Sequence, residues 1–270
     1  MVRTDLALEA KELWEKEAEE TTQLQGVIAR QKGAVTCVEI VNKEGAKALG
    51  KPIGTYVTLD LPSYDRDPER PARELGNMLG EMMGLTKKHR VMVVGLGNEA
   101  ITPDALGPRT AARVFPTRHL IHELPKTFGS FRSVSVVIPG VLATTGIETL
   151  ELVRGAVKAV KPHCVICIDA LAAGNVSRLC NTVQFCNSGI APGSGVGNCR
   201  KAFSEESLGV PVYGIGVPTV VDAGEGSPMI VTPRDIDEQI RYLSRVLAGG
   251  INGALHPEMS YEDFIQFVPQ

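Results

Sequence analysis

The sequence has 270 residues, of which 43% are hydrophobic and 22% are charged, with 28 Gly and 17 Pro. This composition is typical of a globular protein and excludes a disordered or collagen-like chain, and the length allows one large domain or two small ones. With 28 Lys and Arg against 31 Asp and Glu, the formal net charge is −3, so we expect no direct binding of nucleic acid.

The sequence contains no signal that would direct the chain to or through a membrane. Apolar runs are far shorter than the roughly 18 residues that a membrane span needs, and acidic residues stand where a signal peptide would be basic and then apolar. We therefore expect a cytoplasmic protein with six reduced cysteines. Cys164 and Cys167 have CxxC spacing, but they lie in a predicted strand that points them to opposite faces, which favours packing over metal binding.

Hydrophobic periodicity and turn residues predict the following elements in chain order. Helices are expected over residues 5–20, 68–83, about 106–115, about 144–160 and 232–247. Strands are expected over 35–41, 55–61, 90–95, 133–138, 164–169, 183–185 and 211–217. The last helix has a start signal in Thr232 as its cap, followed by Pro233.

The central strands are apolar on both faces and alternate with helices. This pattern predicts an α/β fold of three layers, with a mostly parallel twisted sheet and helices on both faces. No linker composition and no internal repeat interrupts the chain. We therefore expect a single domain over 1–270, with residues 1–60 as an appendage to the sheet.

The motif VVGLGN at 93–98 joins a buried strand to a turn in which Gly95 and Gly97 allow close approach of a ligand. Gly95-x-Gly97-x-x-Ala100 also matches a dinucleotide-binding fingerprint, which requires a helix that begins at the second glycine. Pro103 would interrupt that helix, so a dinucleotide site is not expected.

Two aspartates follow predicted parallel strands. Asp104 lies beyond the strand 90–95, and Asp169 ends the strand 164–169. If these strands are neighbours, the carboxylates converge at the edge where α/β sheets bind ligands, and a close pair separates its pKa values so that it can activate water. Alternatively, each aspartate caps the helix that follows it. Spacing alone does not decide between the two interpretations.

The remaining motifs carry weaker signals. The glycine-rich segment 189–198 is either a cradle of backbone N–H groups or a tight loop. Ser194 lacks the spacing of a nucleophile elbow, which argues against a serine hydrolase. His119 and His122 are three residues apart and would share a face if this segment were helical, but no third ligand accompanies them, which favours surface or packing roles over a metal site.

Ten blocks of the sequence resemble the germination proteases of spore-forming bacteria. They are VRTDLA (2–7), VVGLGN (93–98), TPDALGP (102–108), TRHL (117–120), IPG (138–140), DALA (169–172), PGSGVGN (192–198), GIGVPTVVD (214–222), VLAGGIN (246–252) and ALH (254–256). The blocks are distributed over nearly the whole chain.

The resemblance implies an aspartic-type endopeptidase with a fold similar to hydrogenase maturation proteases. Its two functional aspartates would be Asp104 and Asp169, which activate water and protonate the leaving amine. It further implies small acid-soluble spore proteins as substrates, the spore core as location, and a homo-oligomer, a tetramer in the family. Oxyanion or substrate-backbone donors are expected at Gly95, Gly97, Asn98, Gly193, Ser194, Gly195 and Asn198.

Three features depart from the family pattern. Ala191 stands where the family usually has His, which removes a metal-ligand candidate, and we expect neither a metal nor a cofactor. Only a short connection joins Asp222 to Met229, where the family has a long insert. The family is made as a zymogen, and this chain begins close to the expected mature start. A metal-assisted peptidase and a non-catalytic binding relative remain as alternatives.

Overall fold

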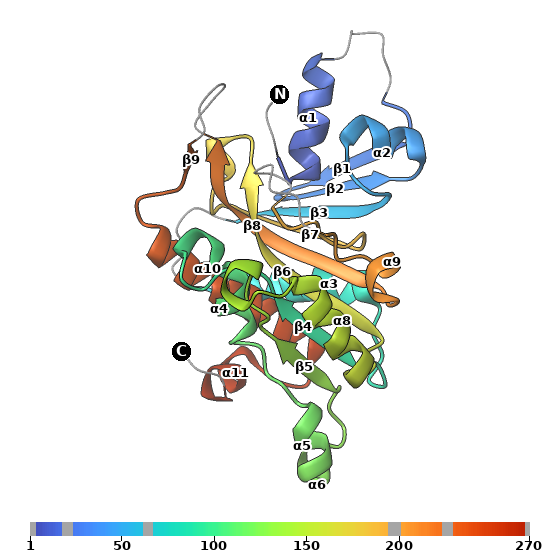
Figure 1. Ribbon diagram of the computed structural model, residues 1–270, viewed down its shortest axis with the longest axis vertical. Coiled ribbons are helices and arrows are strands. Elements are labelled where there is room, and N and C mark those ends of the chain that lie inside the picture. The colour runs from blue at the N-terminus through green and yellow to red at the C-terminus, as the bar shows by residue number, and fades with distance from the viewer. Residues whose placement is uncertain (1–3, 18–23, 62–66, 194–200, 223–228, 268–270) are drawn as a thin grey trace.

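The computed structural model describes residues 4–17, 24–61, 67–193, 201–222 and 229–267, and Figure 1 shows their arrangement. The described part contains a nine-stranded sheet in the order β1-β2-β3-β7-β8-β6-β4-β5, with β9 paired to β8. The strands are β1 (Val27–Lys32), β2 (Val35–Ile40), β3 (Gly54–Asp60), β4 (Val91–Gly95), β5 (Val134–Val137), β6 (Cys164–Ala173), β7 (Thr182–Cys186), β8 (Val212–Asp222) and β9 (Ile230–Val231).

Helices cover the sheet and its connections. The helices are α1 (Ala7–Glu17), α2 (Lys43–Leu49), α3 (Glu69–Met83), α4 (Leu106–Ala111), α5 (Arg118–Glu123), α6 (Pro125–Phe128), α7 (Leu142–Thr145), α8 (Thr149–Val160), α9 (Glu205–Leu208), α10 (Ile236–Leu255) and α11 (Tyr261–Phe267), with 3₁₀ turns η1 (Thr102–Asp104) and η2 (Val176–Arg178). The predicted α/β class is therefore confirmed.

The sheet is mixed rather than mostly parallel. Only the run β5-β4-β6-β8 is parallel, as expected from the helices that connect these strands. All other pairings are antiparallel, because β1 turns directly into β2 at Gly33, β7 enters beside β8 in the opposite direction, and β9 folds back on β8. The strands of the first 60 residues thus continue the sheet beyond β7.

Apolar clusters on both faces of the sheet account for the three layers. On one face α3, α4 and α10 pack over the strands through residues such as Leu75, Leu106 and Leu247. On the other face α8 and α9 pack on β4 and β6. Cys164 belongs to the first cluster and Cys167 to the second, which confirms that this CxxC pair faces opposite ways.

Several predicted boundaries were wrong. The last helix begins at Ile236 rather than at Thr232, because the Thr232 hydroxyl donates to the main-chain oxygen of Thr219 instead of capping a helix. The helix expected over 144–160 is divided into α7 and α8. The strands and helices β1, α2, α5, α6, α9, β9 and α11 were not predicted.

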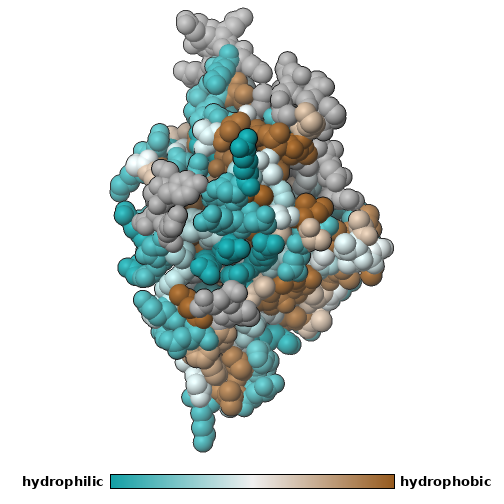
Figure 2. Space-filling view, turned by 90° about the vertical axis from the view of Figure 1, so that its left-hand side faces the viewer, coloured by the Kyte–Doolittle hydropathy of each residue, from teal (hydrophilic) through white to brown (hydrophobic). Residues whose placement is uncertain are grey.

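One face of the molecule carries both polar regions and apolar patches. Figure 2 shows a face on which hydrophobic patches lie between larger hydrophilic regions. The exposed large hydrophobic side chains of the described chain include Met229, Ile230 and Val231 around β9. Among the described helices, none combines the length and the apolar character that crossing a bilayer demands. The five described cysteines are free.

Candidate active site

The turn after β4 is built by close backbone packing. A Cβ atom at Gly107 would overlap the main-chain oxygen of Leu96, so α4 can approach β4 only because this residue is glycine. Gly97 has a φ of 115°, and a Cβ there would overlap the main-chain oxygen of Asp104. These two contacts fold the turn 95–104 back on itself and bring Asp104 above the end of β4.

The carboxylate of Asp104 is held by this turn rather than by a helix. Its Oδ2 accepts a hydrogen bond of 2.7 Å from the backbone N–H of Asn98, and no side chain caps α4. The helix-cap interpretation of Asp104 is therefore wrong. The turn also contains no helix that begins at Gly97, since η1 starts at Thr102, as Pro103 led us to expect.

Asp169 lies in the middle of β6, not at its end. The strand continues to Ala173 because residues 170–173 are small or apolar and pair with β8, so Asp169 is not a helix cap either. Its side chain is only 4% exposed, and its Oδ1 accepts from the N–H of Ala170 at 2.9 Å. The pairing of β6 and β8 shifts register between Leu171 and Ala172, just beyond Asp169.

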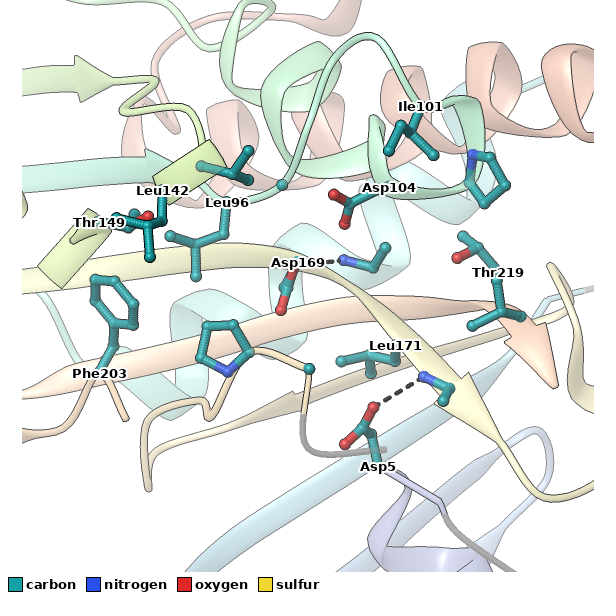
Figure 3. Close-up of a pocket in the computed structure, with 18 of the residues that line it drawn as sticks. Asp5, Leu96, Ile101, Asp104, Leu142, Thr149, Asp169, Leu171, Phe203 and Thr219 are labelled. Carbon is teal, nitrogen blue, oxygen red and sulfur yellow. Dashed lines mark hydrogen bonds between the residues drawn. The ribbon is translucent and has the colours of Figure 1, made fainter. Parts of the chain in front are cut away.

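Asp104 and Asp169 open on one cavity of about 460 Å³. The condition for their convergence is met, because β4 and β6 are parallel neighbours with Gly95 opposite Ile168. Figure 3 shows both carboxylates in the middle of the lining residues, with Phe203 and Leu142 on one side and Thr219 on the other. The cavity is long and largely apolar, which suits an extended segment of polypeptide.

The surroundings of the two aspartates raise the pKa of both carboxyl groups, but they support the charged form of the two groups to different extents. Burial raises the pKa of Asp169 well above its usual range, the negative charges of Asp104 and Asp5 raise it further, and the Ala170 N–H opposes them. Burial also raises the pKa of Asp104, and the Asn98 N–H opposes this shift. Asp169 therefore keeps its proton to higher pH than an ordinary carboxyl group, while Asp104 has the more favourable setting for a negative charge.

Only some of the other predicted site residues line the cavity. Gly97 and Gly193 line the cavity, and the N–H of Gly97 has no hydrogen-bond partner in the described chain. Gly95 is not among the residues that line the cavity, and it packs closely against Gly107 and Ala111 of α4. The Asn98 N–H is already engaged by Asp104 and so is not a free oxyanion donor. The predicted donors Ser194, Gly195 and Asn198 lie outside the described residues.

Sequence reasoning missed several residues that line the cavity. Asp5 was noted only as part of the VRTDLA block, and its carboxylate lies at the cavity wall together with Leu171. Leu142 and Thr149 begin α7 and α8, Phe203 lies just before α9, and none of the three belongs to a motif. Only the folded chain brings these residues to one place, so no signal in the local sequence could have identified them.

A metal-binding cluster is not formed by the residues described. Within residues 4–17, 24–61, 67–193, 201–222 and 229–267, no group of three or more His, Cys, Asp or Glu side chains is arranged to hold a metal ion. His119 and His122 lie on α5 and do not line the cavity.

Comparisons with known proteins identify the family of this chain. The family model described as germination protease matches residues 7–227. The chain is 41% identical to the germination protease of Caldanaerobacter subterraneus subsp. tengcongensis over 322 positions, which cover 99% of this chain and 98% of the relative. It is 38% identical to the germination protease of Clostridium perfringens over 323 positions, which cover 99% of each chain.

The germination protease of Bacillus thuringiensis subsp. konkukian is 40% identical over 261 positions, covering 92% of this chain and 70% of that protein. Among solved structures, the [NiFe] hydrogenase maturation protease HycI from Thermococcus kodakarensis aligns with 64% of this chain and 98% of its own, at 19% identity and a TM-score of 0.39. The alignments to the first two relatives are longer than 270 residues, so those relatives contain segments that this chain lacks. The chain belongs to the germination protease family and is an endopeptidase of that family.

Proposed function

We propose that this endopeptidase degrades small acid-soluble spore proteins in the spore core during germination, with Asp104 and Asp169 as its catalytic pair. The observation that carries the proposal is the presence of two carboxyl groups with raised pKa values at one long apolar cavity. Proteins that are largely disordered when not bound to DNA can enter such a cavity as extended segments without prior unfolding.

The different surroundings of the two aspartates suggest their roles. Asp104, stabilised as an anion by the Asn98 N–H, accepts a proton from a water molecule whose oxygen forms the new bond to the peptide carbon. Asp169, which holds its proton, donates it to the departing amine as the carbon–nitrogen bond breaks. Hydrolysis leaves Asp104 protonated and Asp169 ionised, and transfer of that proton between them restores the starting state.

The backbone of the turn 95–104 provides a hydrogen-bond donor that can stabilise the negative charge that develops on the peptide oxygen. Gly97 lines the cavity, and its N–H has no hydrogen-bond partner in the described chain. A backbone N–H at this place would donate to the oxyanion of the tetrahedral intermediate without any rearrangement. We assign this role to Gly97 rather than to Asn98, whose N–H is bound to Asp104.

The test is hydrolysis of a purified small acid-soluble spore protein, with the fragments identified by mass. Asp104→Asn and Asp169→Asn should each lower the rate at least ~100-fold, the low end for loss of a general acid or base. Asp222→Asn is the control, because Asp222 is exposed and does not line the cavity.

Retention of more than about half of the parent rate by either variant, with the fold intact, would rule out a catalytic role for that aspartate. If the parent itself cleaves no spore protein under any condition, the chain would be a binding relative instead. Both outcomes are visible in the same mass spectra.

A further inference from the structure

The segment 4–9 lies against β6 just beyond Asp169. The N–H of Asp5 donates to the main-chain oxygen of Ala172 at 2.9 Å, and the N–H of Ala172 donates to Oδ2 of Asp5, also at 2.9 Å. Asp5 thus binds both backbone polar groups of one residue, once through its own backbone and once through its carboxylate. Figure 3 shows the second of these bonds at the wall of the cavity.

Several contacts fix Asp5 in this position. The Gln184 side chain of β7 accepts from the N–H of Ala7 at 2.7 Å and donates to the main-chain oxygen of Asp5 at 3.1 Å. Leu6 and Ala7 are fully buried. Glu9 accepts from the N–H groups of Gly174 and Asn175, which follow β6. The segment is therefore anchored to β7 and to the end of β6 by several hydrogen bonds.

The hydrogen bonds between Asp5 and Ala172 lie where the pairing of β6 with β8 is irregular. Leu171 of β6 pairs with Pro218 and Ala172 pairs with Val220, so Thr219 is an extra residue in β8, and such a bulge bends β8 and re-aims the side chains beside it. Asp5 holds Ala172 at this shift, three residues after Asp169. Asp5 thus binds β6 on the stretch that pairs with the bulge of β8.

The carboxylate of Asp5 also contributes charge to the site. The titratable groups that line the cavity are Asp5, Asp104, Glu148, Asp169 and Lys201. Cys167 lies two residues before Asp169 on the same face of β6, and the partly exposed Lys51 lies beside the Asp5 segment, where its Nζ donates to the main-chain oxygen of Thr4. The charges that raise the pKa of Asp169 are those of Asp104 and Asp5.

We propose that Asp5 is a positioning residue for the peptidase reaction: it fixes β6 beyond Asp169 and places a further carboxylate near the catalytic pair, which favours the proton-donating form of Asp169. The inference rests on the proposed roles of Asp104 and Asp169. Asp5 does not itself exchange a proton with the substrate. Its effect is expressed through Asp169.

The experiment compares the pH dependence of kcat/KM for the parent and Asp5→Asn. Asn keeps an oxygen that can accept from Ala172 but removes the charge, so the alkaline limb of the profile should move to lower pH. At pH values between the alkaline limb of the variant and that of the parent, kcat/KM of the variant should fall about tenfold per pH unit relative to the parent. Asp5→Glu, which keeps the charge, should leave the limb in place.

Glu9→Gln is the matched control, since it removes a negative charge from the same segment that does not act on Asp169. It should lower thermal stability without moving the alkaline limb. A limb that stays in place in Asp5→Asn, or that moves equally in Glu9→Gln, would overturn the role of Asp5.

A second readout does not depend on activity. The pH dependence of thermal unfolding also reports the proton on Asp169, and Asp5→Asn should shift that dependence to lower pH as well. If Asp104→Asn and Asp169→Asn retain activity, the proposed function fails. If they are inactive but Asp5→Asn shows parent-like pH dependence in both measurements, only the inference about Asp5 fails.

Discussion

Replacing Asp169 by Asn should stabilise the protein at neutral pH while removing its activity. The Asp169 side chain is only 4% exposed, and its pKa in the folded protein lies well above the value of about 3.9 for an unfolded chain. As pH rises above that value, the unfolded chain releases this proton before the folded protein does. The folded state then binds more protons, so the free energy of unfolding decreases with rising pH.

The magnitude follows from the linkage of one proton. Between the unfolded and folded pKa values, Asp169 should lower the free energy of unfolding by about 1.4 kcal/mol per pH unit. In the Asn variant the free energy of unfolding does not decrease in this way, and the Asn side chain keeps an oxygen that can accept a hydrogen bond from the N–H of Ala170. For a chain of this size, the difference in Tm between variant and parent should grow by about 3 °C per pH unit and then level off at the folded pKa.

The assay is thermal unfolding by circular dichroism at a series of pH values from 4 to 8, with Asp222→Asn as an exposed control. The control should follow the parent throughout. A Tm difference between Asp169→Asn and the parent that stays constant over this range would refute the argument, because it would show that Asp169 ionises in the folded protein as it does in the unfolded one.

Three further outcomes are expected. Gly97→Ala should lower the activity and lower the free energy of unfolding by about 1–3 kcal/mol, because the added Cβ would overlap Asp104 at a positive φ. Gly155→Ala in α8, where a Cβ meets open space, is the control and should be neutral or stabilising. Equal Tm values for the two variants would contradict this reasoning. Treatment with a strong chelator followed by desalting should leave peptidase activity unchanged, because a pair of aspartates that share a proton can activate water and Ala191 replaces a ligand candidate. If activity were lost and zinc or manganese alone restored it, the metal-assisted alternative would be favoured. Burial lowers the pKa of His256 to about 4, so the unfolded state binds more protons between pH 4 and about 6.5 and stability should decline as pH falls through that range, by about 1.4 kcal/mol per unit. His256→Phe, placed among Phe115, Phe131 and Phe264, should lose this pH dependence in chemical unfolding, and an unchanged slope would exclude His256 as its source.

The parts of the site that depend on local sequence were predictable. Gly95 and Gly97 between an apolar strand and Pro103 indicated the tight turn, and the structure has that turn. The position of Asp169 was misjudged because a carboxylate after an apolar run usually marks a strand end, whereas here burial and pairing with β8 extend β6 to Ala173. β1 was missed because its side chains are mostly exposed and polar, which hides the alternation that marks a half-buried strand.

The contacts that complete the site could not be predicted from local sequence patterns. Asp5 and Ala172 are 167 residues apart in sequence, and nothing near either residue indicates the other. The apolar walls of the cavity have the same origin, since Leu142 precedes α8 and Phe203 precedes α9. Composition and periodicity identify each segment as apolar but do not specify which segments meet.

The pairing of Asp5 with Ala172 also has a consequence for biosynthesis. The first residues of the chain leave the ribosome early, but their partner on β6 is made 167 residues later. At about 5–20 residues per second, this delay is on the order of 10–30 s. During that interval the segment around Asp5 has no strand to join, and Asp169 has not yet been made for most of it. The proteolytic centre is therefore assembled late in synthesis, and a nascent chain is not exposed to its own finished active site while its first strands are still folding.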